Sequence, residues 1–330
     1  MLASLYGGNI TEVPVNNNAL KILTLNVTES CDASCIYCNW WQKNTASEPF
    51  EALAKAVTQA ASMGAIAIRI SGGEPLLRPD LPALVAHIRQ CGLISMVCTA
   101  AKCEFDTLRM LLDAGLDVLS ISLDTLQPEL FCEIRGYEIE PVLEKIESLA
   151  ESRTKDGYEI VLSVVLTRLS IDGLEDILMY AQSRDLVVSI TPCQTDIDAL
   201  TFGIGDEVVL RDAMRLTKEA AASGVRVINA DKYLDGIADF MIKHKLPDGH
   251  SCHAGDSAAI RLAGGKLKLC HSLKEIRGTD LTTAWSSKAA EALRSRMARL
   301  DCPGCWLSCH ADTRRPVAHR YGRPEIWEAL

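Results

Sequence analysis

The chain has 330 residues, of which 48% are hydrophobic and 23% charged, the balance of a globular protein with a sizeable core. Lysine and arginine number 34 against 43 aspartates and glutamates, so the formal net charge is -9, and an acidic surface argues against a general nucleic-acid binder. No apolar run is long enough to span a membrane, and the first residues lack a secretory signal. We therefore expect a cytoplasmic protein.

Short apolar runs alternate with amphipathic stretches between residues 21 and 205. One helix is expected from Phe50 to Ala60, with Ser47 as its N-cap and Pro49 in its first turn, and another begins at Phe105 and ends at Gly115. Parallel strands covered on both faces are expected at Lys21–Val27, Ile66–Ile70, Leu93–Cys98, Val118–Leu123, Ile160–Thr167 and Val187–Thr191. Six such repeats predict an α/β fold whose parallel sheet curls into a full or partial barrel.

The pattern changes after residue 205. A helix near 206–222, a short strand at Val225–Asn229 and a helix near 232–243 form a predicted extension over 206–245. Residues 246–330 hold five cysteines and one helix near 286–299. Because so short a segment has little core of its own, we expect it to be a small domain held together by metal. At the other end of the chain, residues 1–20 are expected to be an N-terminal extension.

Cysteine is the unusual component, with 13 copies in a chain without an export signal. A disulfide framework is therefore a poor explanation. Eight cysteines fall into two groups, at 31–38 and 252–309. The other five are expected to be small buried side chains: Cys91, Cys98, Cys103, Cys132 and Cys193. Spaced cysteines in a reducing compartment indicate metal.

The first group, Cys31, Cys35 and Cys38, has the spacing C-x3-C-x2-C and directly follows the first predicted strand. Three thiolates this close together can hold a four-iron cubane and leave one iron without a protein ligand. An open coordination position suits a catalytic centre, whereas a structural metal site is normally closed. A zinc site that borrows a distant ligand is the alternative.

A second segment, Ser71-Gly72-Gly73-Glu74-Pro75, follows the second predicted strand. The glycines let a ligand approach the backbone, and the carboxylate can hold an ammonium group. Taken alone, the segment could be an ordinary turn. In a barrel-like α/β fold, however, both segments lie at the carboxyl ends of neighbouring strands, where ligands bind.

With these two motifs, the sequence resembles the radical S-adenosylmethionine (radical SAM) superfamily. The resemblance implies a partial (β/α)6 TIM-like barrel over residues 21–205, with Cys31, Cys35 and Cys38 as ligands of a [4Fe-4S] cluster. It also implies cofactor-binding roles for seven further residues. Tyr37 would lie near the adenine, and Gly72, Gly73 and Glu74 would bind the methionine amino group. The ribose and carboxylate contacts would come from Ser122, Asp124 and Ser163. For the last three residues, side chains satisfied by the backbone are the alternative.

The family's chemistry implies the cofactors and partners. S-adenosylmethionine (SAM) binds the open iron, and one electron cleaves it to a 5′-deoxyadenosyl radical that removes a hydrogen atom from a C–H bond. A flavodoxin or ferredoxin-type protein is the expected electron donor, and a small molecule the expected substrate. No nucleic-acid or membrane partner is expected.

The second cysteine group lies in the C-terminal segment. Cys252 and Cys270 are spaced C-x12-G-x4-C, with a predicted hairpin turning at Gly264-Gly265, and Cys302-x2-Cys305 could close a four-thiolate cage. Chemistry alone allows iron–sulfur or zinc here. The pattern resembles the twitch or SPASM extensions that carry auxiliary clusters, which implies two [4Fe-4S] clusters in all. Cys309 either replaces one ligand or remains free.

The resemblance does not identify the substrate. One auxiliary cluster, and the few residues before the first strand, favour the small-molecule branch that includes aminocyclitol dehydrogenases and enzymes of antibiotic biosynthesis. We expect hydrogen abstraction from a sugar, aminocyclitol or nucleoside, leading to dehydrogenation, decarboxylation or epimerisation. Cys193 and Cys309 are candidate hydrogen-atom donors. The alternatives are a peptide-modifying radical SAM enzyme and a zinc-stapled binding protein without enzymatic activity.

Overall fold

A computed structural model describes residues 19–42, 47–243, 246, 252, 254–278 and 280–307. In this part of the chain, the strands form one sheet in the order β7-β6-β5-β4-β3-β2-β1-β8-β9, and neighbours are parallel except for β8 and β9. The strands are β1 (Ile22–Thr28), β2 (Ala67–Gly72), β3 (Ile94–Thr99), β4 (Val118–Ser122), β5 (Glu159–Leu166), β6 (Val187–Pro192), β7 (Arg226–Val227), β8 (Ala258–Arg261) and β9 (Leu267–Lys268). The six predicted strands are confirmed.

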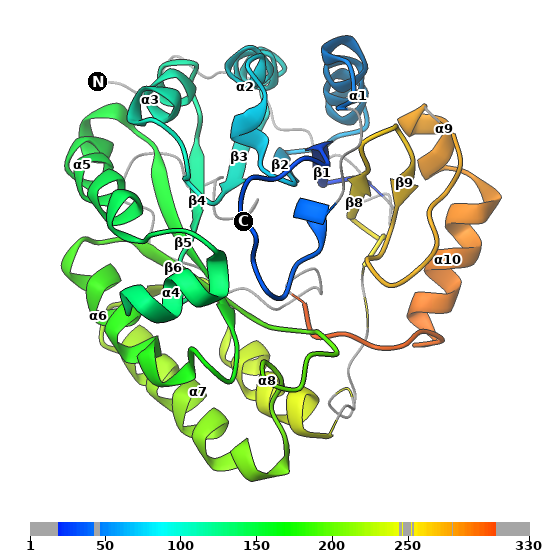
Figure 1. The fold of residues 1–330 in the computed structure, drawn as a ribbon. Coiled ribbons are helices and arrows are strands. Elements are labelled where there is room, and N and C mark those ends of the chain that lie inside the picture. The colour runs from blue at the N-terminus through cyan, green and yellow to red at the C-terminus, as the bar shows by residue number, and fades with distance from the viewer. Residues whose placement is uncertain are drawn as a thin grey trace, which may run out of the picture.

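Helices ring the outside of the curled sheet (Figure 1), which is the arrangement of a partial TIM barrel with a C-terminal extension. They are α1 (Phe50–Ser62), α2 (Leu81–Gln90), α3 (Phe105–Asp113), α4 (Pro128–Arg135), α5 (Glu140–Asp156), α6 (Leu174–Ser183), α7 (Glu207–Ala222) and α8 (Asp231–Lys243). Short 3-10 turns lie at Trp40–Gln42, Pro75–Leu77, Ile171–Gly173 and Ile204–Asp206. None of the helices in the described ranges has both the length and the apolar character that a membrane span needs.

The sheet is buried on both faces, which explains its apolar strands. Its outer face packs under the helices through side chains such as Leu25 and Ile70. On the inner face, a separate apolar cluster forms a floor that includes Ala67, Ile94, Met96, Val118, Val161, Val187 and Ile228. Strands covered on two faces read as continuous apolar runs, so the sequence located them well.

The start of α1 differs from the prediction. Pro49, and not Ser47, occupies the N-cap position, and no side chain caps the helix there. The expectation for Ser47 was wrong because its hydroxyl donates to Oγ1 of Thr28, at 2.9 Å, and so ties this segment to the end of β1. Gly115 follows α3 as predicted, in the left-handed conformation (φ +92°).

The C-terminal extension continues the sheet of the barrel. The hairpin of β8 and β9 turns at Gly264-Gly265 as predicted, with φ +93° and +86°, and β8 pairs with β1 from Ile22↔Ala258 to Leu25↔Arg261. A buried ion pair between Arg261 and Glu48 adds a second connection. The helix expected near 286–299 is α10 (Lys288–Ala298), preceded by a short α9 (Leu281–Trp285), and Ser287 caps α10 by accepting from the Ala290 N–H.

Candidate functional site

The cysteine loop begins at the carboxyl end of β1, as the sequence predicted. Cys35 is buried, and Cys31 and Cys38 are half-buried. Burial raises the pKa of Cys31 to about 11, and the negative charges of Glu74 and Cys35 raise it further. Cys38 acts on Cys35 in the same way. The structure therefore brings the three thiols close enough to interact electrostatically.

Helix α4 holds this loop in place from one side. The Ile36 N–H donates to the Ile134 carbonyl at 2.9 Å, at the last turn of the helix. The helix ends at Gly136 in the left-handed conformation (φ +79°), where any side chain would collide with Ser34. Nη1 of Arg135 lies 3.7 Å from Sγ of Cys35, so a fixed cation stands beside one of the three thiols.

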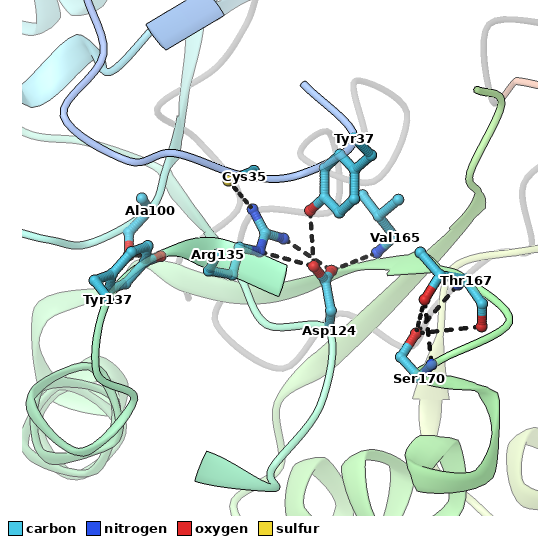
Figure 2. A network of polar contacts seen from close by, with 9 residues as sticks. All are labelled: Cys35, Tyr37, Ala100, Asp124, Arg135, Tyr137, Val165, Thr167 and Ser170. Carbon is cyan, nitrogen blue, oxygen red and sulfur yellow. Dashed lines mark hydrogen bonds and ion pairs between the residues drawn. The ribbon is translucent and has the colours of Figure 1, made fainter. Parts of the chain in front are cut away.

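A buried polar network anchors that arginine (Figure 2). Arg135 donates to Asp124 from Nη2 at 2.8 Å and pairs with it through Nε at 2.7 Å. The same carboxylate accepts from the Tyr37 hydroxyl at 2.7 Å and from the Val165 N–H at 2.8 Å. Asp124 is fully buried, and both of its oxygens are engaged. These contacts suit a residue that positions Arg135 and Tyr37, and its direct contact with SAM stays a prediction.

Sequence reasoning missed Arg135. An arginine in the last turn of a helix, followed by glycine, is common because it complements the helix dipole. Nothing in the local sequence therefore separates it from an ordinary surface residue. Its role depends on Asp124 and Cys35, which lie 11 and 100 residues away in the chain.

The Gly-Gly-Glu segment is bonded directly to the cysteine loop. The Gly73 N–H donates to the Thr28 carbonyl and the Glu74 N–H to the Ser30 carbonyl, both at 2.8 Å. The backbone at Ser30 packs so closely against Gly73 that a Cβ would collide with its carbonyl. The two motifs that the sequence singled out thus form one structural unit at the carboxyl ends of β1 and β2.

Glu74 itself points into a buried, hydrogen-bonded position. Its carboxylate accepts from the Leu76 N–H at 3.0 Å and from the Thr99 hydroxyl and the Ala100 N–H, both at 2.8 Å. Burial raises its pKa to about 7, although the three hydrogen bonds oppose the shift. An N–H donor or a cation bound here would favour the ionised form, so the site suits the amino group of a ligand.

Ser122, Ser163 and Cys193 lie at the same end of the barrel. Ser122 and Ser163 are register partners on β4 and β5. Ser163 lines a cavity of about 160 Å³ inside the curled sheet. Cys193 directly follows β6, and its N–H donates to the Leu166 carbonyl at 2.8 Å. Burial, with the charge of Asp124, raises the thiol pKa to about 12, which keeps the S–H bond that the predicted donor role requires.

Three cysteines of the second group, Cys252, Cys270 and Cys302, also lie near one another. Burial raises the pKa of Cys252, and the nearby Cys270 and Cys302 thiols raise it further. The Ser272 N–H donates to Sγ of Cys270 at 3.3 Å. Cys305 lies in the same short segment as Cys302. Cys309 lies outside the described residues.

Trp306 fixes the Cys302–Cys305 segment to the barrel. Its indole Nε1–H donates to the Tyr233 carbonyl at 2.9 Å, and the two rings stack with their centroids 5.7 Å apart. The Trp306 N–H donates to the Gln194 side chain, next to Cys193, at 3.2 Å. The ring packs against Gly236 of α8 so closely that a side chain there would collide with it. The Cys302–Cys305 segment is therefore held near the carboxyl end of β6.

The donor set fits iron–sulfur chemistry. Among the described residues, no three cysteine, histidine, aspartate or glutamate side chains converge as the ligands of a single metal ion would. A cubane has no need of such convergence, because each thiolate binds a different iron. Cys35 interacts with both Cys31 and Cys38, and a buried carboxylate lies beside them, so this donor set suits a cluster with a chelating amino-acid ligand.

Comparison with known proteins agrees with this geometry. The Radical SAM superfamily profile matches residues 25–181. A probable GTP 3′,8-cyclase of Methanococcus vannielii is 32% identical over 289 residues, which cover 84% of this chain and 92% of that protein. A second probable GTP 3′,8-cyclase, from Methanococcus aeolicus, is 33% identical over 185 residues, or 53% of this chain and 60% of the relative. The chain thus spans about three fifths of some of its curated relatives.

Two further proteins extend the comparison. The PqqA peptide cyclase of Methylocella silvestris is 28% identical over 271 residues, which cover 78% of this chain and 69% of the relative. The crystal structure of Streptococcus suis SuiB bound to S-adenosylmethionine has the same fold, with a TM-score of 0.67 at 16% identity over 84% of this chain and 68% of that one. The superfamily match includes the cysteine loop, Glu74 and α4. This chain belongs to the radical SAM superfamily of enzymes.

Proposed function

We propose that this enzyme binds SAM on a [4Fe-4S] cluster held by Cys31, Cys35 and Cys38, and abstracts a hydrogen atom from a small polar metabolite such as a sugar, aminocyclitol or nucleoside. When bound, the cluster and SAM supply the 5′-deoxyadenosyl radical that removes this hydrogen atom. The chain's own residues bind and orient both ligands and keep water out of the barrel.

The SAM-facing roles follow from the contacts at the strand ends. Glu74 is held in one orientation by three hydrogen bonds, and we propose that its carboxylate accepts a further bond from the amino group of SAM. The absence of side chains at Gly72 and Gly73 lets the backbone of Thr28 and Ser30 pack directly beside this segment. Arg135 and Tyr37 are fixed by Asp124 against the cysteine loop. This pre-organisation lowers the cost of ordering the site when SAM binds.

The cavity inside the sheet is the observation that carries the choice of substrate. At about 160 Å³ it has room for about five water molecules, which is small for a ligand site. Hydroxyl groups of Ser120, Ser163, Ser189 and Thr191 line it. A compact hydroxylated ring or chain would find hydrogen-bond partners there. The cyclase relatives support the proposal, because their names state a nucleotide substrate.

The second cysteine group would complete the reaction. We propose that Cys252, Cys270, Cys302 and Cys305 hold an auxiliary [4Fe-4S] cluster, which would supply an electron acceptor for dehydrogenation. If instead the product is an epimer, we propose that the protonated Cys193 thiol at the end of β6 returns a hydrogen atom, and that the thiyl radical left on Cys193 then takes up one electron and one proton, the electron coming from the external electron donor. Decarboxylation requires a carboxylate next to the substrate radical, and the radical anion left after loss of carbon dioxide must then either give one electron to an acceptor such as the proposed auxiliary cluster or take up one electron and two protons.

Peptide modification is the second candidate, favoured by the match to the PqqA peptide cyclase over 78% of this chain. The experiment that separates the two uses anaerobically reconstituted, reduced protein with SAM. Nucleosides, sugars and aminocyclitols are compared with candidate precursor peptides as stimulants of 5′-deoxyadenosine formation. Deuterium transfer from labelled substrate into that product then identifies the C–H bond.

The expected result is stimulation by a small hydroxylated metabolite. The product mass then distinguishes loss of two hydrogens, loss of carbon dioxide and no change. Stimulation by peptides alone would overturn the choice of substrate, and failure to cleave SAM at all would overturn the function. Cys31→Ala should abolish cleavage, while Cys305→Ala, the matched control, should retain cleavage and lose the iron of one cluster.

A further inference from the structure

The inner face of the barrel is apolar at one end and becomes polar toward the other. Its floor is the apolar cluster that includes Ile94, Val118 and Val187. The cavity of about 160 Å³ adjoins this floor, since Met96, Val161 and Ile228 belong to both. Its polar lining comes from the next inward-facing positions along the strands. A polar layer between an apolar floor and a cofactor site is a place where a substrate group can be held.

Arg69 is the charged side chain among the described residues that line this cavity. It lies on β2, where it pairs in register with Thr24 of β1 and Met96 of β3. Its charge acts on Cys98 of the neighbouring strand β3, where it opposes the effect of burial, which raises the pKa of that thiol. Arg69 also lines a smaller adjoining cavity of about 60 Å³ beside Cys270 and His271. The guanidinium is therefore positioned inside the barrel.

The hydroxyl groups are arranged opposite this cation. Ser163 and Ser189 are register partners on β5 and β6, and Thr191 lies two residues further along β6. Asn229, in contrast, uses its amide to bridge the N–H and carbonyl of Ile190, at 2.7 and 2.9 Å. Asn229 thus closes the wall of the cavity, while the serines and the threonine present hydroxyl groups to it.

We propose that this cavity binds the anionic group of the substrate, a carboxylate or a phosphate, with Arg69 as its cationic partner and Ser163, Ser189 and Thr191 as hydrogen-bonding groups. Resting on the proposed function, this narrows the substrate to an acidic hydroxylated metabolite. A guanidinium presents a planar fork of donors that matches either anion, and a charge-assisted bond in a partly buried site is strong. With its acidic end held in the barrel, the substrate would present its C–H bonds toward the strand ends.

The test is anaerobic titration calorimetry on the reconstituted, SAM-loaded enzyme with three probes: glucuronate, glucose 6-phosphate and glucose. We expect at least one of the two acids to bind at least about tenfold more tightly than glucose. Whichever of the two binds more tightly shows whether the site prefers a carboxylate or a phosphate. Arg69→Gln should weaken that binding by about 30-fold or more, because removing one partner of a desolvated charge pair is costly. Arg69→Lys should lose less.

The control is Arg215→Gln, which removes an exposed arginine of α7 that pairs with Glu219. It should leave acid binding unchanged. If Arg69→Gln does not accumulate as folded protein, Ser189→Val serves as the second variant and should weaken acid binding several-fold. Equal binding of the acids and glucose, or full binding by Arg69→Gln, overturns the anion site.

Failure of this inference is distinguishable from failure of the proposed function. Iron content and the slow cleavage of SAM without substrate depend on the cysteine loop and Glu74, and should be the same in Arg69→Gln as in the wild-type enzyme. Normal cleavage without selective acid binding overturns the anion site alone. Absence of cleavage in the wild-type enzyme overturns the proposed function.

Discussion

The ionisation of Glu74 makes a quantitative prediction about SAM binding. The proposed partner of this carboxylate is the amino group of SAM, whose N–H bonds donate to it, so the ionised form is the one that binds well. Its pKa in the free site is about 7, because burial outweighs the three hydrogen bonds to the carboxylate. At that pKa about 90% is ionised at pH 8 and about 10% at pH 6, so the apparent Kd for SAM should weaken about tenfold over that range.

Anaerobic titration calorimetry of SAM into the reconstituted enzyme at pH 6, 7 and 8 measures this directly. Glu74→Gln should bind SAM weakly at every pH and lose the pH dependence, whereas Glu51→Gln on the surface of α1 should keep it. A raised pKa also means that the apoprotein loses stability as pH rises from the unfolded value near 4.5 through 7. A wild-type Kd that is constant from pH 6 to 8, or a Gln variant that keeps the tenfold change, would refute the reasoning.

Three further predictions concern how the cysteine segments are held. Arg135→Leu leaves the buried carboxylate of Asp124 unpaired, so it should lower the free energy of unfolding of the apoprotein in urea by about 3–5 kcal/mol and reduce iron uptake. An unchanged urea midpoint would contradict the network in Figure 2. Trp306→Ala should lower the free energy of unfolding by about 3–5 kcal/mol. The iron content should fall toward that of one cluster, while SAM cleavage persists. A full iron count would show that the indole does not anchor Cys302. Gly73→Ala should lower iron content and SAM affinity together, because its Cβ meets a backbone carbonyl, and wild-type values for both would contradict that contact.

The sequence by itself determined the strands of the barrel and the position of the two motifs. Buried parallel strands such as β4 and β6 are continuous apolar runs, so their locations follow from local composition. The cysteine loop and Glu74 come directly after β1 and β2, and parallel neighbouring strands end on the same side. That Cys31 and Glu74 share one site was therefore predictable before any contact was known.

Tertiary structure alone decided how that site is supported. The pairing of β8 with β1 joins residues more than two hundred positions apart, and no local pattern specifies which edge a short strand will join. Arg135 acquires its role from Asp124 and Cys35, and Arg69 from side chains on other strands across the barrel. Local propensity indicates whether a residue favours a helix or a strand. The energetic contribution of a buried charge depends instead on its partners, which come close to it only in the folded chain.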